Sequence, residues 1–185
     1  MVIDKHAEDQ WVLWFDNISR EDVAVVGGKS ASLGEMTSST GVPVPYGFAT
    51  TAQAYRAFLK ETGLDKKISE MIANLTNVED SRQLREISAS IRQAIVDAKL
   101  PLSFEQSIRQ AYAELAAKVG EETPFVAVRS SATAEDLPDA SFAGQQETYL
   151  NVRGAEEVVE RVKECFASMF TDRAVYYRTK KNFSH

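Results

Sequence analysis

A long helical stretch in the middle of the chain, about residues 53–118, constrains the fold most, because only short strand-like segments remain on either side. Apolar residues recur within it at steps of three and four, which places them on one face of a helix. They are Leu84, Ile87, Ile91 and Ile95. Pro101 breaks this pattern, and Ser103 with Gln106 predicts a capping box that opens the next helix. The chain is therefore predicted to be α+β, with a helical subdomain inserted into a small mixed sheet.

Short apolar runs outside this stretch predict the strands. The runs are Trp11–Phe15, Gly47–Thr50, Phe125–Val128 and Gln146–Val152. The third run is fully apolar and ends at Arg129, so we expect a buried strand with an arginine at its end. In the fourth run, alternation predicts that Thr148, Leu150 and Val152 share one face. Residues 1–10 are polar and aperiodic, which is typical of a flexible tail.

Helix signals also occur before and after the central stretch. Ser19 and Asp22 predict a capping box at a short helical turn. Thr51 predicts the N-cap of a helix that runs to about Glu61. Further helices are predicted over about 30–37, over 155–170 and from 172 onward.

The composition limits the possible function classes. Of the 185 residues, 44% are apolar and 26% are charged, as in ordinary globular proteins. The net charge of −6 argues against a nucleic-acid partner, because nucleic-acid-binding proteins usually carry a basic face. Cys165 is the single cysteine and the histidines are His6 and His185, so we expect neither a disulfide within the chain nor a metal site. No apolar run is long enough to span a bilayer, and the expected location is the cytoplasm, without a membrane partner.

The first candidate for a binding site is Gly27-Gly28-Lys29-Ser30, which precedes a predicted helix. Glycines let backbone amides approach an anion, and the unpaired N–H groups at a helix N-terminus attract negative charge. Lys29 adds a full positive charge. A P-loop requires glycine at position 23, where this chain has Val23, so this is not a Walker A motif. The alternative interpretation is a glycine turn with a solvated lysine.

The second candidate is Arg129, which is followed by Ser130 and Ser131. A strand end holds the guanidinium rigidly, and its planar fork matches the oxygens of a phosphate. The two serines can donate hydrogen bonds to the same anion. The alternative interpretation is an ion pair between Arg129 and Glu135 or Asp136.

The third candidate is the polar turn at residues 141–148. Gly144 within this turn suggests that a ligand approaches the backbone closely, because glycine has no side chain to obstruct it. An ordinary hairpin turn is the alternative interpretation.

Taken together, these segments resemble the phosphoenolpyruvate synthases. The matching segments are Val26–Met36, Val42–Thr51, Val128–Asp136, Ala140–Thr148 and Phe170–Ala174, with Tyr177 and Arg178. The resemblance covers nearly the whole chain after residue 10 and implies the first part of an ATP-grasp-like nucleotide-binding domain. It further implies that Lys29 and Arg129 bind the phosphates of ATP, together with Gly144 and Thr148. The supporting loop residues that it implies are Ser130, Ser131, Gln145 and Gln146.

The resemblance also implies an enzyme larger than this chain, a pyruvate, water dikinase. Such enzymes use Mg²⁺ and convert pyruvate, ATP and water to phosphoenolpyruvate, AMP and phosphate. A swivelling domain with a histidine carries the phosphoryl group to a pyruvate-binding barrel. The family's nucleotide domain continues beyond the position of His185, so this chain is expected to be a fragment without catalytic residues and inactive by itself. Its expected contacts are the missing half of its own domain and the swivelling histidine domain.

Three other interpretations of the same residues stay open. The chain also resembles the front domain of pyruvate phosphate dikinase at the lysine motif, and that of rifampicin phosphotransferase in the loop after Arg129. A non-catalytic scaffold lobe is the third, with the helical stretch at residues 53–118 as its surface for protein partners.

Overall fold

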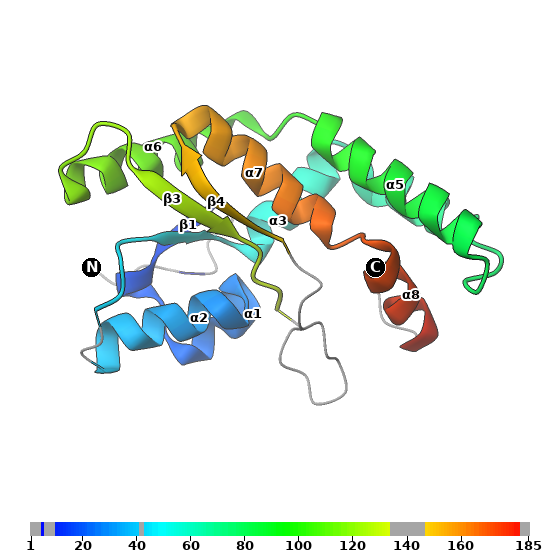
Figure 1. The fold of residues 1–185 in the computed structure, drawn as a ribbon, viewed down its shortest axis with the longest axis horizontal. Coiled ribbons are helices and arrows are strands. Elements are labelled where there is room, and N and C mark those ends of the chain that lie inside the picture. Colours follow the sequence, from blue (N-terminus) through cyan, green and yellow to red (C-terminus); the bar gives the residue numbers. More distant parts are fainter. Residues whose placement is uncertain (1–4, 6–9, 41–42, 134–146, 182–185) are drawn as a thin grey trace.

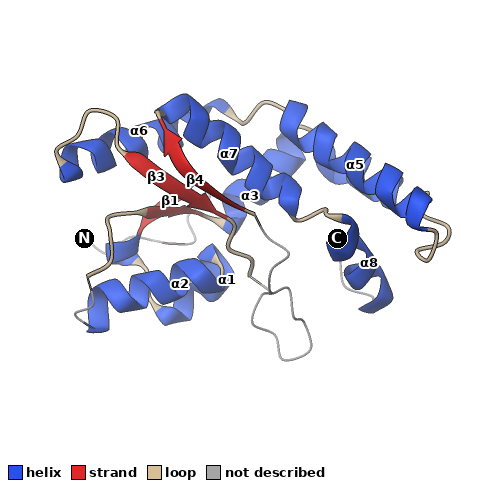
Figure 2. Cartoon of the chain, viewed as in Figure 1, coloured by secondary structure: helices blue, strands red, loops and turns tan. Residues whose placement is uncertain are grey.

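The computed structural model describes residue 5 and residues 10–40, 43–133 and 147–181. Short elements make up the N-terminal part, and longer helices with a second strand pair make up the rest (Figure 1, Figure 2). The strands are β1 (Val12–Trp14), β2 (Phe48–Thr50), β3 (Phe125–Arg129) and β4 (Thr148–Arg153). The α-helices are α1 (Val23–Val26), α2 (Gly28–Glu35), α3 (Ala52–Glu61), α4 (Leu64–Ala73), α5 (Ser81–Asp97), α6 (Leu102–Val119), α7 (Ala155–Ser168) and α8 (Asp172–Lys181). Within the described ranges, no helix has both the length and the apolar composition needed to cross a membrane.

The strands form two separate antiparallel pairs. β1 pairs with β2, with Val12 opposite Thr50, and β3 pairs with β4, with Arg129 opposite Thr148. The predicted α+β class is confirmed, but the predicted small mixed sheet is wrong for the described residues, which contain two antiparallel ladders. Apolar runs predict that strands exist, whereas the neighbour of each strand depends on tertiary packing.

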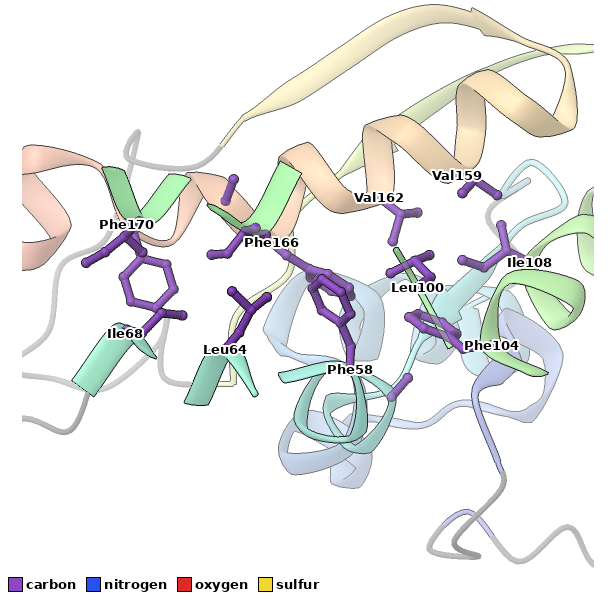
Figure 3. Packing of buried hydrophobic residues seen from close by; sticks show 14 of the residues in the cluster. Phe58, Leu64, Ile68, Leu100, Phe104, Ile108, Val159, Val162, Phe166 and Phe170 are labelled. Atoms are coloured by element: carbon purple, nitrogen blue, oxygen red, sulfur yellow. The ribbon is translucent and has the colours of Figure 1, made fainter. Parts of the chain in front are cut away.

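The main hydrophobic core lies between the helices and β4. It joins residues from α3 to α8 with Val152 of β4. Figure 3 shows part of this core, with Phe58 and Phe104 packed against Phe166. Phe58 and Phe104 are 0% and 1% exposed, and both rings lie beside Phe166 of α7, with centroid separations of 6.0 and 6.2 Å. α7 lies against both β3 and β4, so this core also supports the second strand pair (Figure 2).

A smaller core holds the N-terminal elements together. Its buried residues come from β1, β2, α1, α2 and the turn before α1: Leu13, Ile18, Val25, Val26, Ala31 and Ala49. Gly34 of α2 packs directly on Ile18, since a Cβ at Gly34 would lie 2.5 Å from atoms of Ile18. This core therefore sets the position of α2, which carries the Gly-Gly-Lys segment.

Several predicted helix signals are confirmed. α5 buries Leu84, Ile91 and Ile95 of the predicted stripe. Thr51 caps α3, because its hydroxyl accepts a hydrogen bond from the N–H of Ala54 at 3.1 Å.

The predicted capping box of Ser103 and Gln106 is wrong. α6 already begins at Leu102, and Pro101 takes the N-cap position with φ −51°. The carbonyl of Pro101 accepts the first helical hydrogen bond, from the N–H of Glu105 at 2.9 Å. Pro101 has an extended ψ of 137°, so it stands just outside the helix, and Ser103 lies within the first turn and not at the N-cap.

The outer face of the β3–β4 pair differs from expectation. Phe125 and Leu150 are 63% and 69% exposed, so the strand that the sequence predicted as buried packs on one face only. The prediction that Thr148, Leu150 and Val152 share a face is also wrong, since Val152 is buried and the other two are exposed. A β-bulge at Asn151, with φ +57°, adds one residue to the strand and reverses the alternation.

Phe58→Ala is expected to lower the free energy of unfolding by about 3–5 kcal/mol, because it leaves a cavity among buried aromatic rings. Urea unfolding followed by circular dichroism measures this loss. The matched control is Phe125→Ala, for which we expect a change within about 1 kcal/mol because this ring is largely exposed. Equal losses in the two variants would contradict the described core.

Asp22 closes the predicted capping box and gives the fold a pH dependence. Its carboxylate accepts hydrogen bonds from the N–H of Ser19 at 2.7 Å and from its hydroxyl at 2.9 Å, and it pairs with Lys5 at 2.6 Å. Burial raises the pKa of this carboxyl, but the hydrogen bonds from Lys5 and Ser19 outweigh burial, and the pKa lies below its usual value. The charged form is thus favoured in the folded state, which stabilises the fold above the unfolded pKa of about 4.

Asp22→Ala is therefore expected to lower the free energy of unfolding by about 1–2 kcal/mol at neutral pH. The difference from the unsubstituted protein should shrink as the pH falls below about 4, because wild-type Asp22 is protonated there and loses the same stabilisation. Urea titrations at several pH values measure it, with the exposed Glu21→Ala as the control. A difference that stays constant down to the lowest pH would refute this role of the charge.

Candidate functional site

The Gly-Gly-Lys segment lies at the junction of α1 and α2. Gly27 ends α1, where its N–H donates to the carbonyl of Val23 at 2.8 Å, and it is also the N-cap of α2. It has φ +80° and ψ 164°, a conformation that is essentially restricted to glycine. This backbone reversal places Gly28 and Lys29 in the first turn of α2.

The segment that leaves β3 passes directly across this helix start. A Cβ at Gly27 would lie 2.3 Å from the carbonyl oxygen of Ser131. The N–H of Gly28 donates to the carbonyl of Ala132 at 3.2 Å, and the N–H of Ser30 donates to the hydroxyl of Ser131 at 3.1 Å. The sequence suggested that the unpaired amides at this helix start receive an anion, but these two donors are bound by the protein itself.

Lys29 reaches the same strand exit. Its Nζ donates to the carbonyl of Ser130 at 3.3 Å, across 101 positions of sequence. Ser130 is the residue after Arg129, so the two candidate basic residues are brought to one end of β3. The side chain of Lys29 is thus partly buried and bound to Ser130, rather than fully solvated as in the alternative interpretation.

Arg129 and Thr148 occupy the ends of the two strands at this same edge. They are cross-strand partners, and both are exposed on the outer face. The N–H and the hydroxyl of Ser130 each donate to the carbonyl of Glu147 at 3.3 Å, which fixes the strand exit to the start of β4. Among the described residues, the guanidinium of Arg129 makes no ion pair, and its alternative partners Glu135 and Asp136 lie outside them.

Five further sequence-predicted positions stand as follows. Ser131 lies beside the start of α2 and Ser130 between Lys29 and Glu147. Gly144, Gln145 and Gln146 lie outside the described residues. The structure thus brings Lys29, Arg129, Ser130, Ser131 and Thr148 together from three elements.

Sequence reasoning missed the surroundings of Glu147. This residue helps to line a hollow of about 680 Å³ between α5, α7, the start of α8 and β4. Burial, and after it the charge of Glu164, raises the pKa of Tyr149 to about 12, and this tyrosine also lines the hollow. No sequence signal marks the cluster, because Tyr149 and Glu164 come together only when α7 packs on β4.

Cys165 is a buried residue of α7, next to Glu164 in the chain. Burial, and after it the charges of Glu164 and Glu147, raises the pKa of its thiol to about 12, while the charge of Lys29 acts in the opposite direction. A thiol with such a pKa stays protonated at neutral pH and is a poor nucleophile. In the described part of the chain, no group of three or more His, Cys, Asp or Glu side chains is placed to hold a metal ion.

Comparison with known protein families finds a match over most of the chain. The sequence profile described as "Pyruvate phosphate dikinase, AMP/ATP-binding domain" matches residues 23–185. The chain belongs to this family. The matched range contains every candidate site residue, from Lys29 to Thr148, and the resemblance stated from the motifs is confirmed.

Relatives of the chain carry a consistent name. A probable phosphoenolpyruvate synthase of Staphylothermus marinus is 52% identical over 180 residues, which is 96% of this chain and 21% of the relative. The phosphoenolpyruvate synthase of Neisseria meningitidis is 52% identical over 180 residues, with 96% and 22% covered. A probable phosphoenolpyruvate synthase of Methanocaldococcus jannaschii is 51% identical over 176 residues, with 95% and 15% covered. The chain thus spans about a fifth of the length of these relatives.

Gly27→Ala is expected to destabilise the protein by at least about 1–3 kcal/mol more than Gly154→Ala, because only the first adds a clash with Ser131. The two glycines are closely matched, since both are helix N-caps with positive φ, +80° and +91°. A Cβ at Gly154 meets nothing within 4 Å. Thermal unfolding of the two variants measures the difference, and equal losses would show that the approach of Ser131 imposes no constraint.

Proposed function

We propose that this chain binds the phosphates of ATP through Lys29 and Arg129. The observation that carries the proposal is the hydrogen bond from Lys29 Nζ to the carbonyl of Ser130, because it joins the two basic residues at one end of β3. The hydroxyl of Thr148, the cross-strand partner of Arg129, is available at the same edge as a neutral donor. The family description as an AMP/ATP-binding domain supports this ligand.

The residues present fit a polyphosphate. The planar guanidinium of Arg129 suits bidentate binding of phosphate oxygens, and the ammonium of Lys29 supplies a mobile point charge. ATP supplies the phosphoryl group to be transferred, and the two cations hold and neutralise the phosphates as charge develops. We place Gly144 beside the phosphates, with Ser130, Ser131, Gln145 and Gln146 in support. Mg²⁺ belongs to the complete protein in this proposal, with ligands from outside this chain.

We further propose that the complete protein is a pyruvate, water dikinase that forms phosphoenolpyruvate, AMP and phosphate in the cytoplasm. The names of the relatives support this assignment. An ATP-grasp-like fold of the nucleotide-binding domain is part of the same proposal. In this proposal the chain alone is inactive and contacts the rest of its nucleotide domain and the swivelling histidine domain.

A second candidate is the front domain of a pyruvate phosphate dikinase, because the matching family carries that description. The two activities differ in the second acceptor, water or inorganic phosphate. Pyruvate-dependent AMP formation by the complete protein, measured with and without added phosphate, separates them. An absolute requirement for phosphate would favour the dikinase that uses it.

Lys29→Ala and Arg129→Ala are each expected to weaken ATP binding to the complete protein about 10- to 100-fold, because each removes a charge-assisted hydrogen bond to phosphate. Isothermal titration calorimetry with ATP measures the dissociation constants. The controls are Lys118→Ala, whose ammonium lies 5.0 Å from the Trp14 ring, and Arg82→Ala, which pairs with Glu86 on α5.

Both controls are expected to bind ATP as the unsubstituted protein does. Unchanged ATP affinity in both Lys29→Ala and Arg129→Ala would refute the phosphate site. Failure of the unsubstituted protein to bind ATP at all would instead favour the scaffold interpretation.

A further inference from the structure

The contacts between the start of α2 and the segment after β3 form a unit, which we call the clasp: residues 27–30 and 130–132. We propose that Ser131 and Gly27 are positioning residues of the clasp, which hold Lys29 where it acts together with Arg129. This inference rests on the proposed function. It gives Ser131 a different role from that of a donor to the phosphates.

The hydrogen bonds of the clasp bracket Lys29. The hydroxyl of Ser131 accepts from the N–H of Ser30 at 3.1 Å, and the carbonyl of Ala132 accepts from the N–H of Gly28 at 3.2 Å. These donors are the residues immediately before and after Lys29. The backbone of Lys29 is therefore tied on both sides to the chain that follows Arg129.

The clasp connects two structural units that have separate cores. α2 belongs to the smaller core through Ala31, whereas β3 packs on the larger core through Val126 and Val128. Lys29 and Arg129 are thus carried by elements that different cores position. A small shift of α2 against β3 would separate the two cations without unfolding either core, and the clasp opposes such a shift.

The segment after β3, which forms the second half of the clasp, is itself bound to the residue before β4. Ser130 donates two hydrogen bonds to the carbonyl of Glu147, each 3.3 Å long, next to Thr148. The strand exit is therefore held by β4, and Ser131 extends that support to α2. Ser131 acts on Lys29 through the backbone of Ser30, whereas strand pairing alone already positions Arg129.

Gly27 is the steric half of the clasp. A Cβ at this position would lie 2.3 Å from the carbonyl oxygen and 2.5 Å from the hydroxyl oxygen of Ser131. A side chain at Gly27 would therefore push α2 away from the strand exit and lengthen the bond between Ser30 and Ser131. The absence of a side chain is required by this contact as well as by the backbone conformation.

A double-mutant cycle in the complete protein tests the role of Ser131. ATP dissociation constants are measured for the unsubstituted protein, Ser131→Ala, Lys29→Ala and the double variant. We expect Ser131→Ala to weaken ATP binding about five- to tenfold, which is the loss expected for one hydrogen bond. In the Lys29→Ala background the same substitution should change the affinity by less than about twofold. Ser131 acts through the position of the Lys29 side chain, and that side chain is absent from this background.

A matched pair of variants separates positioning from a general loss of stability. Ser131→Thr keeps the accepting hydroxyl, and Ser131→Val replaces it with a methyl group in a side chain of the same shape. We expect Ser131→Thr to bind ATP nearly as the unsubstituted protein does and Ser131→Val to bind it about as weakly as Ser131→Ala. Thermal unfolding confirms that each variant is folded before its affinity is compared.

The outcomes distinguish the proposals. Equal weakening by Ser131→Ala in both backgrounds would overturn the positioning role, because it would show that Ser131 contacts the phosphates independently of Lys29. Unchanged affinity in Ser131→Ala, or equal affinities of the Thr and Val variants, would overturn it too. If Lys29→Ala itself leaves ATP binding unchanged, the positioning role is overturned as well, whereas the proposed phosphate site fails only if Arg129→Ala also leaves it unchanged.

Discussion

The packing of Phe166 in α7 is the contact on which the rest of the structure depends. Its ring lies beside Tyr55 and Phe58 of α3 and Phe104 of α6, with centroid separations of 4.9, 6.0 and 6.2 Å. Buried aromatic side chains contribute large apolar areas, so this cluster fixes α7 against the helical layer (Figure 3). α7 in turn supports β3 and β4, whose ends carry Arg129 and Thr148. The site therefore has a rigid support that is distant from it in sequence.

An acidic chain with a net charge of −6 nevertheless brings basic residues together at one strand end. Lys29 arrives from the smaller core and Arg129 from the larger one, and the clasp of Gly27 and Ser131 holds the two parts in register. Because phosphoryl transfer depends on positioning and charge stabilisation, small relative movements of these cations would have large consequences for the proposed phosphate site. Two backbone N–H groups at the start of α2 donate hydrogen bonds within the clasp, so they stabilise the contact between α2 and the segment after β3.

Local signals in the sequence predicted the elements well and the pairing of the strands poorly. Thr51 was correctly predicted to cap α3, and the stripe of α5 was correctly placed, since both depend on residues close together in the chain. The bulge at Asn151 was missed, because a residue with φ +57° interrupts alternation without any change in apolar pattern. The exposed outer face of Phe125 and Leu150 was missed too, as apolarity alone does not show which face another element covers.

The sequence by itself determined the α+β class, most helix positions and the family, and it pointed to Lys29 and Arg129 as candidates, because each depends on short-range pattern or motif. Tertiary structure alone decided that residues 27–30 meet residues 130–132, since that contact joins positions 101 apart. It also decided that Gly27 has no room for a side chain and that the hydroxyl of Ser131 binds the N–H of Ser30 in α2. The physical reason is that steric exclusion and hydrogen-bond partners are set by packing between elements, which no local pattern encodes.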